Sequence, residues 1–238
     1  MAGKKLEELS DMEIDVLKEI SNIGTGNAAT AVSKMLEGRI DIQVPAIKFL
    51  SFDDTADIIG GAENEVIGIL VTLNDDVDGM MMFVMDKKSA WIVANHMMSF
   101  LTGSKNLEDS TCSQEEILQS EIEAYDEEAR RKIKGKQAFT EMEISALQEF
   151  GNIISASYLS AVSTMTGLCI SPSVPALADD MAGAILSVPA IEFGMVSDKV
   201  LLIQSLFEYR QKKAEGFFIL IPTPEAFELI FKKLGLHE

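Results

Sequence analysis

Two stretches of the chain share one polar pattern, an acidic or hydroxyl residue followed by Glu after four positions and by Asn after three more. The pattern occupies Asp15, Glu19 and Asn22, and again Ser145, Glu149 and Asn152. On a helix, with ~100° per residue, the members of one set fall within about 60° of one another. A carboxylate accepts hydrogen bonds and pairs with cations, whereas an amide donates and accepts without carrying charge. Each stretch therefore predicts a helix with a small carboxylate–amide cluster on its exposed face.

The alternative is that these side chains only solvate a helix surface. Asn is a poor residue in the middle of a helix. Asp15 and Glu19 are like charges four residues apart, which mildly destabilises a helix. Because Glu and Asn occur twice in the same register, we favour a function beyond solubility.

Both stretches belong to an internal repeat. Residues 12–46 align without gaps on 142–176, with 15 of 35 positions identical. A weaker similarity pairs 66–86 with 200–222, each of which reads as strand, turn, Gly and apolar strand before a helix-like tail. The chain is therefore predicted to contain two copies of one unit.

The repeat argues against a nucleotide cofactor. Gly24, Gly26 and Ala29 match the glycine fingerprint of a dinucleotide-binding turn, but the second copy has Ile154 and Ala156 where the glycines stand. Such a turn follows a strand, whereas the preceding "EIDVLKEISN" carries charges at helical spacing. We expect Gly24 to allow close helix packing, and Gly26 and Ala156 to leave room on the polar face for a partner backbone. The opposite, apolar side is expected to be buried: Val16, Leu17, Ile20 and Ile23.

Composition excludes several classes of function. The net charge of −18 disfavours nucleic acid and anionic membranes as partners, although an acidic surface is also common in cytosolic proteins. No stretch is apolar enough to span a membrane, and the charged N-terminus does not resemble a signal peptide. With two cysteines and two histidines, a His/Cys metal site or a Ser–His triad is not expected. These features predict a cytoplasmic protein without a metal of its own.

The doubled pattern, with Pro45 and Pro175 each 23 residues after the Asn, closely resembles the CheC/CheX/FliY phosphatases of bacterial chemotaxis. The stretches "EIDVLKEISNIGTGNAATAVSKML", "SPSVP" and "DDMAGAIL" resemble the CheC branch in particular. The resemblance implies a single α/β (α+β) domain of two repeats related by a pseudo-two-fold axis. A central antiparallel sheet of about six strands would carry the two long motif helices on one face. The expected parts are a first repeat over 1–103, a charged and partly helical insert over 104–138, and a second repeat over 139–238.

The resemblance also implies an activity, hydrolysis of the phospho-aspartate on the response regulator CheY. Glu19 or Glu149 would pair with a lysine of the receiver, and Asn22 or Asn152 would orient the attacking water. The chemistry is consistent, because an acyl phosphate is already reactive and a neutral amide does not repel phosphate. The protein would need no cofactor of its own, since the receiver brings Mg²⁺.

Other residues are weaker candidates. Asp15 and Ser145 would support the motif by contacting the receiver or by shaping the helix start. Pro45 and Pro175 are expected to mark the loop after the strand that follows each motif helix. The family also binds the receptor deamidase CheD, and Asp180 in 179–186 is the candidate contact; an acidic helix start is the alternative reading.

The insert carries a capping-box pattern, Ser113-x-x-Glu116, followed by apolar residues at helical spacing. A solvated helix or linker and a docking element both fit its segregated charges. The protein is expected to act as a monomer. The competing function is a catalytically silent adaptor of the CheC type that binds the receiver, CheD or both. A structural component of the flagellar switch is a third class, disfavoured because both Glu/Asn pairs are intact.

Overall fold

The computed structural model describes residues 10–35, 40–101, 139–193, 199–209 and 212–236. The first half contains α1 (Asp11–Met35), β1 (Ile40–Ser51), α2 (Phe52–Ile58), β2 (Glu65–Asp75), β3 (Gly79–Asp86) and α3 (Lys87–Leu101). The second half contains α5 (Glu141–Thr166), β4 (Ile170–Pro172), β5 (Ala176–Met181), α6 (Ala182–Phe193), β6 (Lys199–Tyr209), β7 (Lys212–Pro222) and α7 (Pro224–Lys233). The predicted insert, with Ser113 and Glu116, lies outside the described residues.

In the described part of the chain, seven strands form one antiparallel sheet in the order β1-β6-β7-β3-β2-β4, and β5 also pairs with β2. This confirms the predicted antiparallel sheet. Seven strands stand where about six were expected, because the strand that follows α5 is broken into β4 and β5. The edge strand of each repeat pairs with the other repeat: β1 lies against β6, and β4 and β5 lie against β2. The two repeats are therefore parts of a single domain.

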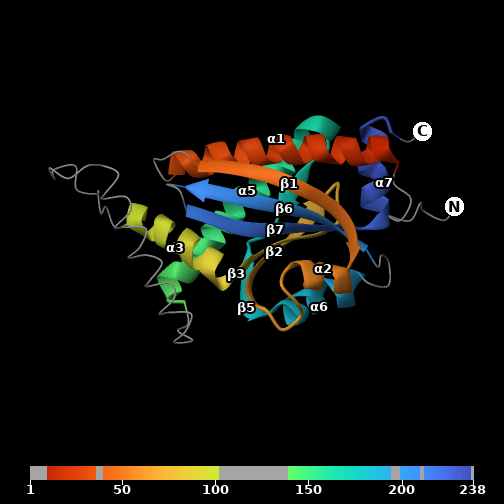
Figure 1. Cartoon of the computed structure of the whole chain (residues 1–238). Helices are drawn as coiled ribbons and strands as arrows, with labels where there is room; N and C mark the ends of the chain where they lie inside the picture. The colour runs from red at the N-terminus through yellow and green to blue at the C-terminus, as the bar shows by residue number, and fades with distance from the viewer. Residues whose placement is uncertain (1–9, 36–39, 102–138, 194–198, 210–211, 237–238) are drawn as a thin grey trace.

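Helices cover both faces of the sheet (Figure 1). On one face, α1, α5, α3 and α7 share a core with side chains that alternate along the central strands, among them Ile67, Ile69, Phe83 and Phe218. On the other face, α2 and α6 pack against the intervening residues, among them Val66, Val84 and Leu202. Because successive strand residues point to opposite faces, β3 must be apolar along its length, and "MMMFVM" is buried throughout.

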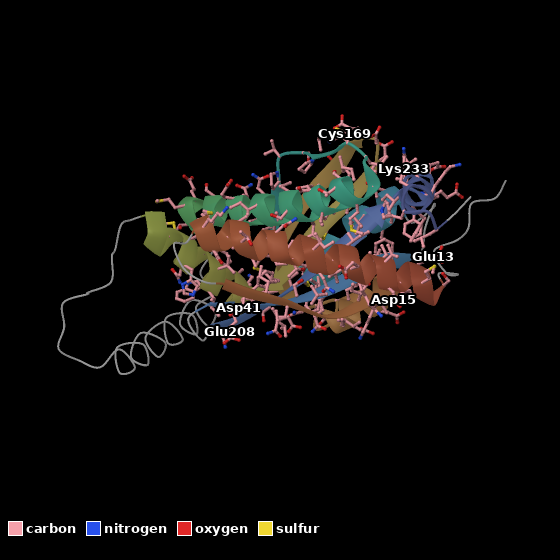
Figure 2. All side chains as sticks on the ribbon, turned by 90° about the horizontal axis from the view of Figure 1, so that it is seen from above. Glu13, Asp15, Asp41, Cys169, Glu208 and Lys233 are labelled. Carbon is pink, nitrogen blue, oxygen red and sulfur yellow. The ribbon has the colours of Figure 1, made fainter. Side chains whose placement is uncertain are left out.

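Among the described elements the motif helices are the longest, with 25 residues in α1 and 26 in α5. Figure 2 shows them side by side above the sheet, running in opposite directions, with α3 and α7 at either end of the pair. The prediction of two long motif helices on one face is confirmed. The predicted internal similarity also holds at the level of elements, since β2, β3 and α3 are matched in order by β6, β7 and α7.

Candidate functional site

The same device begins both motif helices. The Ser10 N–H donates to Glu13 Oε2 at 2.6 Å, and the Glu13 N–H donates back to Ser10 Oγ at 3.4 Å. Thr140 and Glu143 repeat this capping box at 2.8 Å and 3.3 Å. In each helix the motif Asn is the twelfth residue after the cap. The box therefore fixes where the helix begins and which turn carries the motif. The Ser/Thr-x-x-Glu pattern at both positions is the sequence signal from which it could have been predicted.

Close contact between α1 and α5 holds the motif helices in place. A Cβ on Gly24 would lie 2.9 Å from Tyr158 Cδ1 and 3.2 Å from Tyr158 Cα, so only glycine fits here. Next to it, the hydroxyls of Thr25 and Tyr158 share a buried hydrogen bond of 2.6 Å. The prediction that Gly24 permits tight helix packing is confirmed. Burial raises the pKa of Tyr158, although interactions with the hydroxyls of Thr25 and Ser205 act to lower it, so the phenol stays neutral at physiological pH.

Most of the predicted motif side chains are exposed. On α1 these are Asp15, Glu19 and Asn22, and on α5 they are Ser145 and Glu149, while Asn152 is half-buried. Figure 2 shows Asp15 projecting from the outer side of α1, away from α5. Lys18 Nζ lies 3.0 Å from Asp15 Oδ1, but both side chains are exposed, so the pair adds little stability. The predicted polar face therefore exists on both helices.

The buried side of α1 is narrower than predicted. Leu17 and Ile20 are buried and Val16 is half-buried, but Ile23 is 36% exposed. Ile23 follows Asn22 directly and lies ~100° from it around the helix, which puts it on the flank of the buried side. Gly26 is also exposed, and a Cβ added there would meet no atom within 4 Å. The predicted space on the polar face is present beside the first motif.

The two prolines differ in their surroundings. Pro175 lies between β4 and β5, in a loop as predicted, and its carbonyl accepts a 3.3 Å hydrogen bond from Gln148 Nε2 on α5. Pro45, predicted in a loop, instead lies within β1, where the pairing with β6 shifts register between Gln43 and Ala46. An edge strand tolerates a proline at a bulge because the missing N–H removes no ladder bond there.

The Gln148 bond ties the Pro175 loop to the motif helix, one residue before Glu149. Gln148 is not among the residues predicted for the site. No pattern in the sequence marks it, because the aligned residue in the first repeat is Lys18.

The 179–186 stretch begins as a strand. β5 ends at Met181 and α6 begins at Ala182, so Asp180 lies in β5 and the acidic-helix-start reading is wrong. Asp180 is exposed, and its Oδ1 accepts the Met181 N–H at 2.7 Å. Its neighbour Asp179 lies 3.0 Å from Lys87 Nζ, which also reaches Glu65 at 3.1 Å. Asp180 thus remains available to a partner, while Asp179 joins β5 to the start of α3.

Burial lowers the pKa of Lys87, and its hydrogen bonds and charge attraction to Asp179 and Glu65 raise that pKa; the net effect is a rise. Within the described ranges, no three or more His, Cys, Asp or Glu side chains are grouped so as to hold a metal ion. No helix in the described part of the chain is long and apolar enough to cross a membrane.

Comparison with known proteins shows which families and structures the chain resembles. A family model described as the CheC-like family matches residues 12–49 and 142–178, which contain both motifs. Over 229 residues the chain is 31% identical to the CheY-P phosphatase CheC of Bacillus subtilis (strain 168), covering 95% of this chain and 96% of that protein. It is 29% identical over 94 residues to the flagellar motor switch phosphatase FliY of the same organism, covering 40% of this chain and 24% of that protein. The crystal structure of Thermotoga maritima FliY superposes with a TM-score of 0.66 at 20% identity, over 97% of this chain and 99% of that one, and shows a shared fold.

Proposed function

The chain belongs to the CheC-like family, and from this premise we propose that it hydrolyses the phospho-aspartate of a CheY-type receiver domain. The observation that carries the proposal is the 31% identity, over nearly the full length of both chains, to a protein named as a CheY-P phosphatase. The Glu and the Asn of each motif helix provide the side chains that would bind the receiver and position the attacking water.

The proposed reaction transfers the phosphoryl group to water. The water oxygen attacks phosphorus in line, the bond from phosphorus to the aspartate oxygen breaks, and the products are inorganic phosphate and a free carboxylate. Asn22 or Asn152 holds the water through its side-chain amide, which accepts and donates hydrogen bonds without adding negative charge beside the phosphate. A 100-fold acceleration requires only ~2.7 kcal/mol, which one positioned hydrogen-bonding group can supply.

We assign Glu19 and Glu149 to binding. Each lies one turn before its Asn, ~4.5 Å along the helix axis, and is exposed. A carboxylate at this distance suits an ion pair with a lysine of the receiver, and it keeps its own charge away from the phosphate. The receiver, as the substrate, brings the Mg²⁺ and the cationic groups of its own active site. Asp15 and Ser145 lie a further turn away and support the contact.

The experiment that tests the function is phosphate release from a phosphorylated receiver, with the parent protein, Asn22→Ala, Asn152→Ala and the double variant. Each single variant should retain one working site, and the double variant should lose turnover while it still binds the receiver. Asn27→Ala is the matched control, because Asn27 is also exposed on α1 but lies ~140° from Asn22 around the helix. A parent that binds the receiver without releasing phosphate would support the silent adaptor instead.

A second partner is proposed at 179–186, a receptor deamidase of the CheD type. The support is that Asp180 is exposed and that exposed apolar side chains follow it along the chain: Met181, Val188 and Ile191, at 49%, 47% and 80% exposure. Asp180→Lys should weaken binding of CheD. In the absence of CheD, the variant should hydrolyse the phospho-aspartate of the receiver at the parent's rate. Unchanged CheD binding by Asp180→Lys would contradict this assignment.

A further inference from the structure

One exposed methionine precedes each motif at the same place in the repeat. Met12 is 69% exposed and Met142 is 58% exposed. Each lies in the first turn of its helix, seven residues before the motif Glu and ten before the motif Asn. Single exposed apolar residues are common on protein surfaces, but here two aligned positions of the repeat both keep a large one.

The methionines share the helix face of the motifs. At ~100° per residue, positions 12, 15, 19, 22 and 26 fall within about 80° of arc, and the aligned positions of α5 do the same. We call each set of five positions a motif stripe. Its described members are exposed or half-buried in both helices. From Met12 to Asn22 the stripe extends ~15 Å along the axis, and its only large apolar side chain is the methionine at one end.

The size of a specific interface argues that the whole stripe is used. A stable protein–protein contact buries ~800 Å² on each partner, which a Glu and an Asn cannot provide alone. The polar groups of the motif stripe position the reaction, but they contribute little apolar burial. Methionine is unbranched and polarizable and adapts its shape to a partner surface. The exposed methionine at the end of each stripe can therefore supply the apolar contact area that the Glu and Asn of the motif lack.

We propose that Met12 and Met142 are apolar anchors for the phosphorylated receiver, each serving the Glu and Asn of its own helix. The inference rests on the proposed function for its partner. Because α1 and α5 run in opposite directions (Figure 2), the two methionines lie at opposite ends of the helix pair. Each anchor thus contacts only the receiver bound at its own site.

The test compares Met12→Gln/Met142→Gln with the parent, by titration for the Kd of the phosphorylated receiver and by initial rates for KM and kcat. Gln keeps the length of the side chain and removes its apolar character. We expect Kd and KM to rise about tenfold, as for an interface anchor, with kcat within twofold. Met12→Leu/Met142→Leu should restore both values. Asp57→Gln is the control for a surface substitution away from the motifs, since Asp57 is exposed on α2, which covers the opposite face of the sheet.

Site-resolved variants sharpen the test. In an Asn152→Ala background, where only the first site hydrolyses the phospho-aspartate, Met12→Gln should raise KM and Met142→Gln should not. A Kd and KM equal to the parent's, or a rise accompanied by a lower melting temperature, would overturn the anchors. If the parent binds the receiver but releases no phosphate, the proposed function fails. The Kd values of the parent and of Met12→Gln/Met142→Gln still show whether the methionines contribute to binding. A parent that does not bind the receiver overturns both.

Discussion

Two glycines on one helix, two residues apart, allow the packing of the motif helices to be measured. Replacing Gly24 by Ala puts a Cβ 2.9 Å from Tyr158 Cδ1, 3.1 Å from Cγ and 3.2 Å from Cα. Because the Cα is backbone, no rotation of the Tyr158 side chain relieves this contact, and α1 and α5 must move apart. Overpacking of this kind costs ~1–3 kcal/mol. Replacing Gly by Ala in a helix interior gains ~1 kcal/mol, so the net destabilisation by Gly24→Ala is up to ~2 kcal/mol.

Gly26→Ala is the matched control. The position is exposed, and no atom lies within 4 Å of the added Cβ. Only the gain in helix propensity remains, and the variant should be more stable than the parent by up to ~1 kcal/mol. The two variants should therefore differ by ~1–3 kcal/mol in the free energy of unfolding. For a chain of this size that corresponds to about 2–12 °C in melting temperature.

The assay is thermal and urea unfolding of the parent, Gly24→Ala and Gly26→Ala, followed by far-ultraviolet circular dichroism. The expected order of stability is Gly26→Ala, then the parent, then Gly24→Ala. Equal shifts in the same direction for both variants would refute the argument that α1 and α5 are held together through the Gly24 contact. The m-values in urea should stay equal, because a change there would indicate a different unfolded state rather than altered packing.

Three further predictions concern a buried hydrogen bond, an ion-pair cluster and the insert. A double-mutant cycle of Thr25→Val and Tyr158→Phe should give a coupling free energy of ~1 kcal/mol, as for a buried neutral hydrogen bond; additive effects would contradict that bond. Because Lys87 has a raised pKa in the folded state, its ion pairs stabilise the fold fully below its ordinary value of 10.5 and lose that effect as the pH rises above it. Unfolding titrations from pH 8 to 11.5 should therefore show a smaller decline for Lys87→Met than for the parent, and an equal decline would oppose this. Excision of 106–136 behind a short Gly/Ser join should keep phosphate release within a few-fold of the parent, whereas a folded but inactive variant would assign the insert a role in the site.

Local features of this fold were predictable because they depend on neighbours in sequence. The 35-residue alignment located both motif helices, and the 3.6-residue period placed Glu19 and Asn22 on the exposed side. The position of Gly24 on the packing side followed from the same period. Ile23 was misplaced because a helical wheel does not say how wide the contact with neighbouring elements will be.

Non-local features were not predictable from the same patterns. The sequence repeat does not indicate which strands of the two copies pair, and the structure shows β1 paired with β6 and β5 paired with β2. Pairing between distant strands depends on the whole assembly and leaves no mark in either segment alone. Pro45 was expected in a loop for the same reason, since only the sheet order reveals that β1 is an edge strand that tolerates a bulge.

The pseudo-two-fold relation repeats the Glu, the Asn and the capping box at the start of each motif helix, but it does not repeat the other contacts of these helices. Three residues after Asn22, Thr25 is tied to Tyr158 of the other motif helix, whereas the residue aligned with Tyr158 is Ala28, which has no hydroxyl. On the second helix, the Gln148 side chain donates a hydrogen bond to the carbonyl of Pro175. The aligned residue of the first helix, Lys18, instead forms an exposed ion pair with Asp15. A shift of ~1 Å in a catalytic group is enough to change a rate up to ~100-fold. Two sites with the same chemical groups and different supporting contacts should therefore hydrolyse the phospho-aspartate at different rates, with the first site dependent on the packing of α1 against α5 and the second on the loop between β4 and β5.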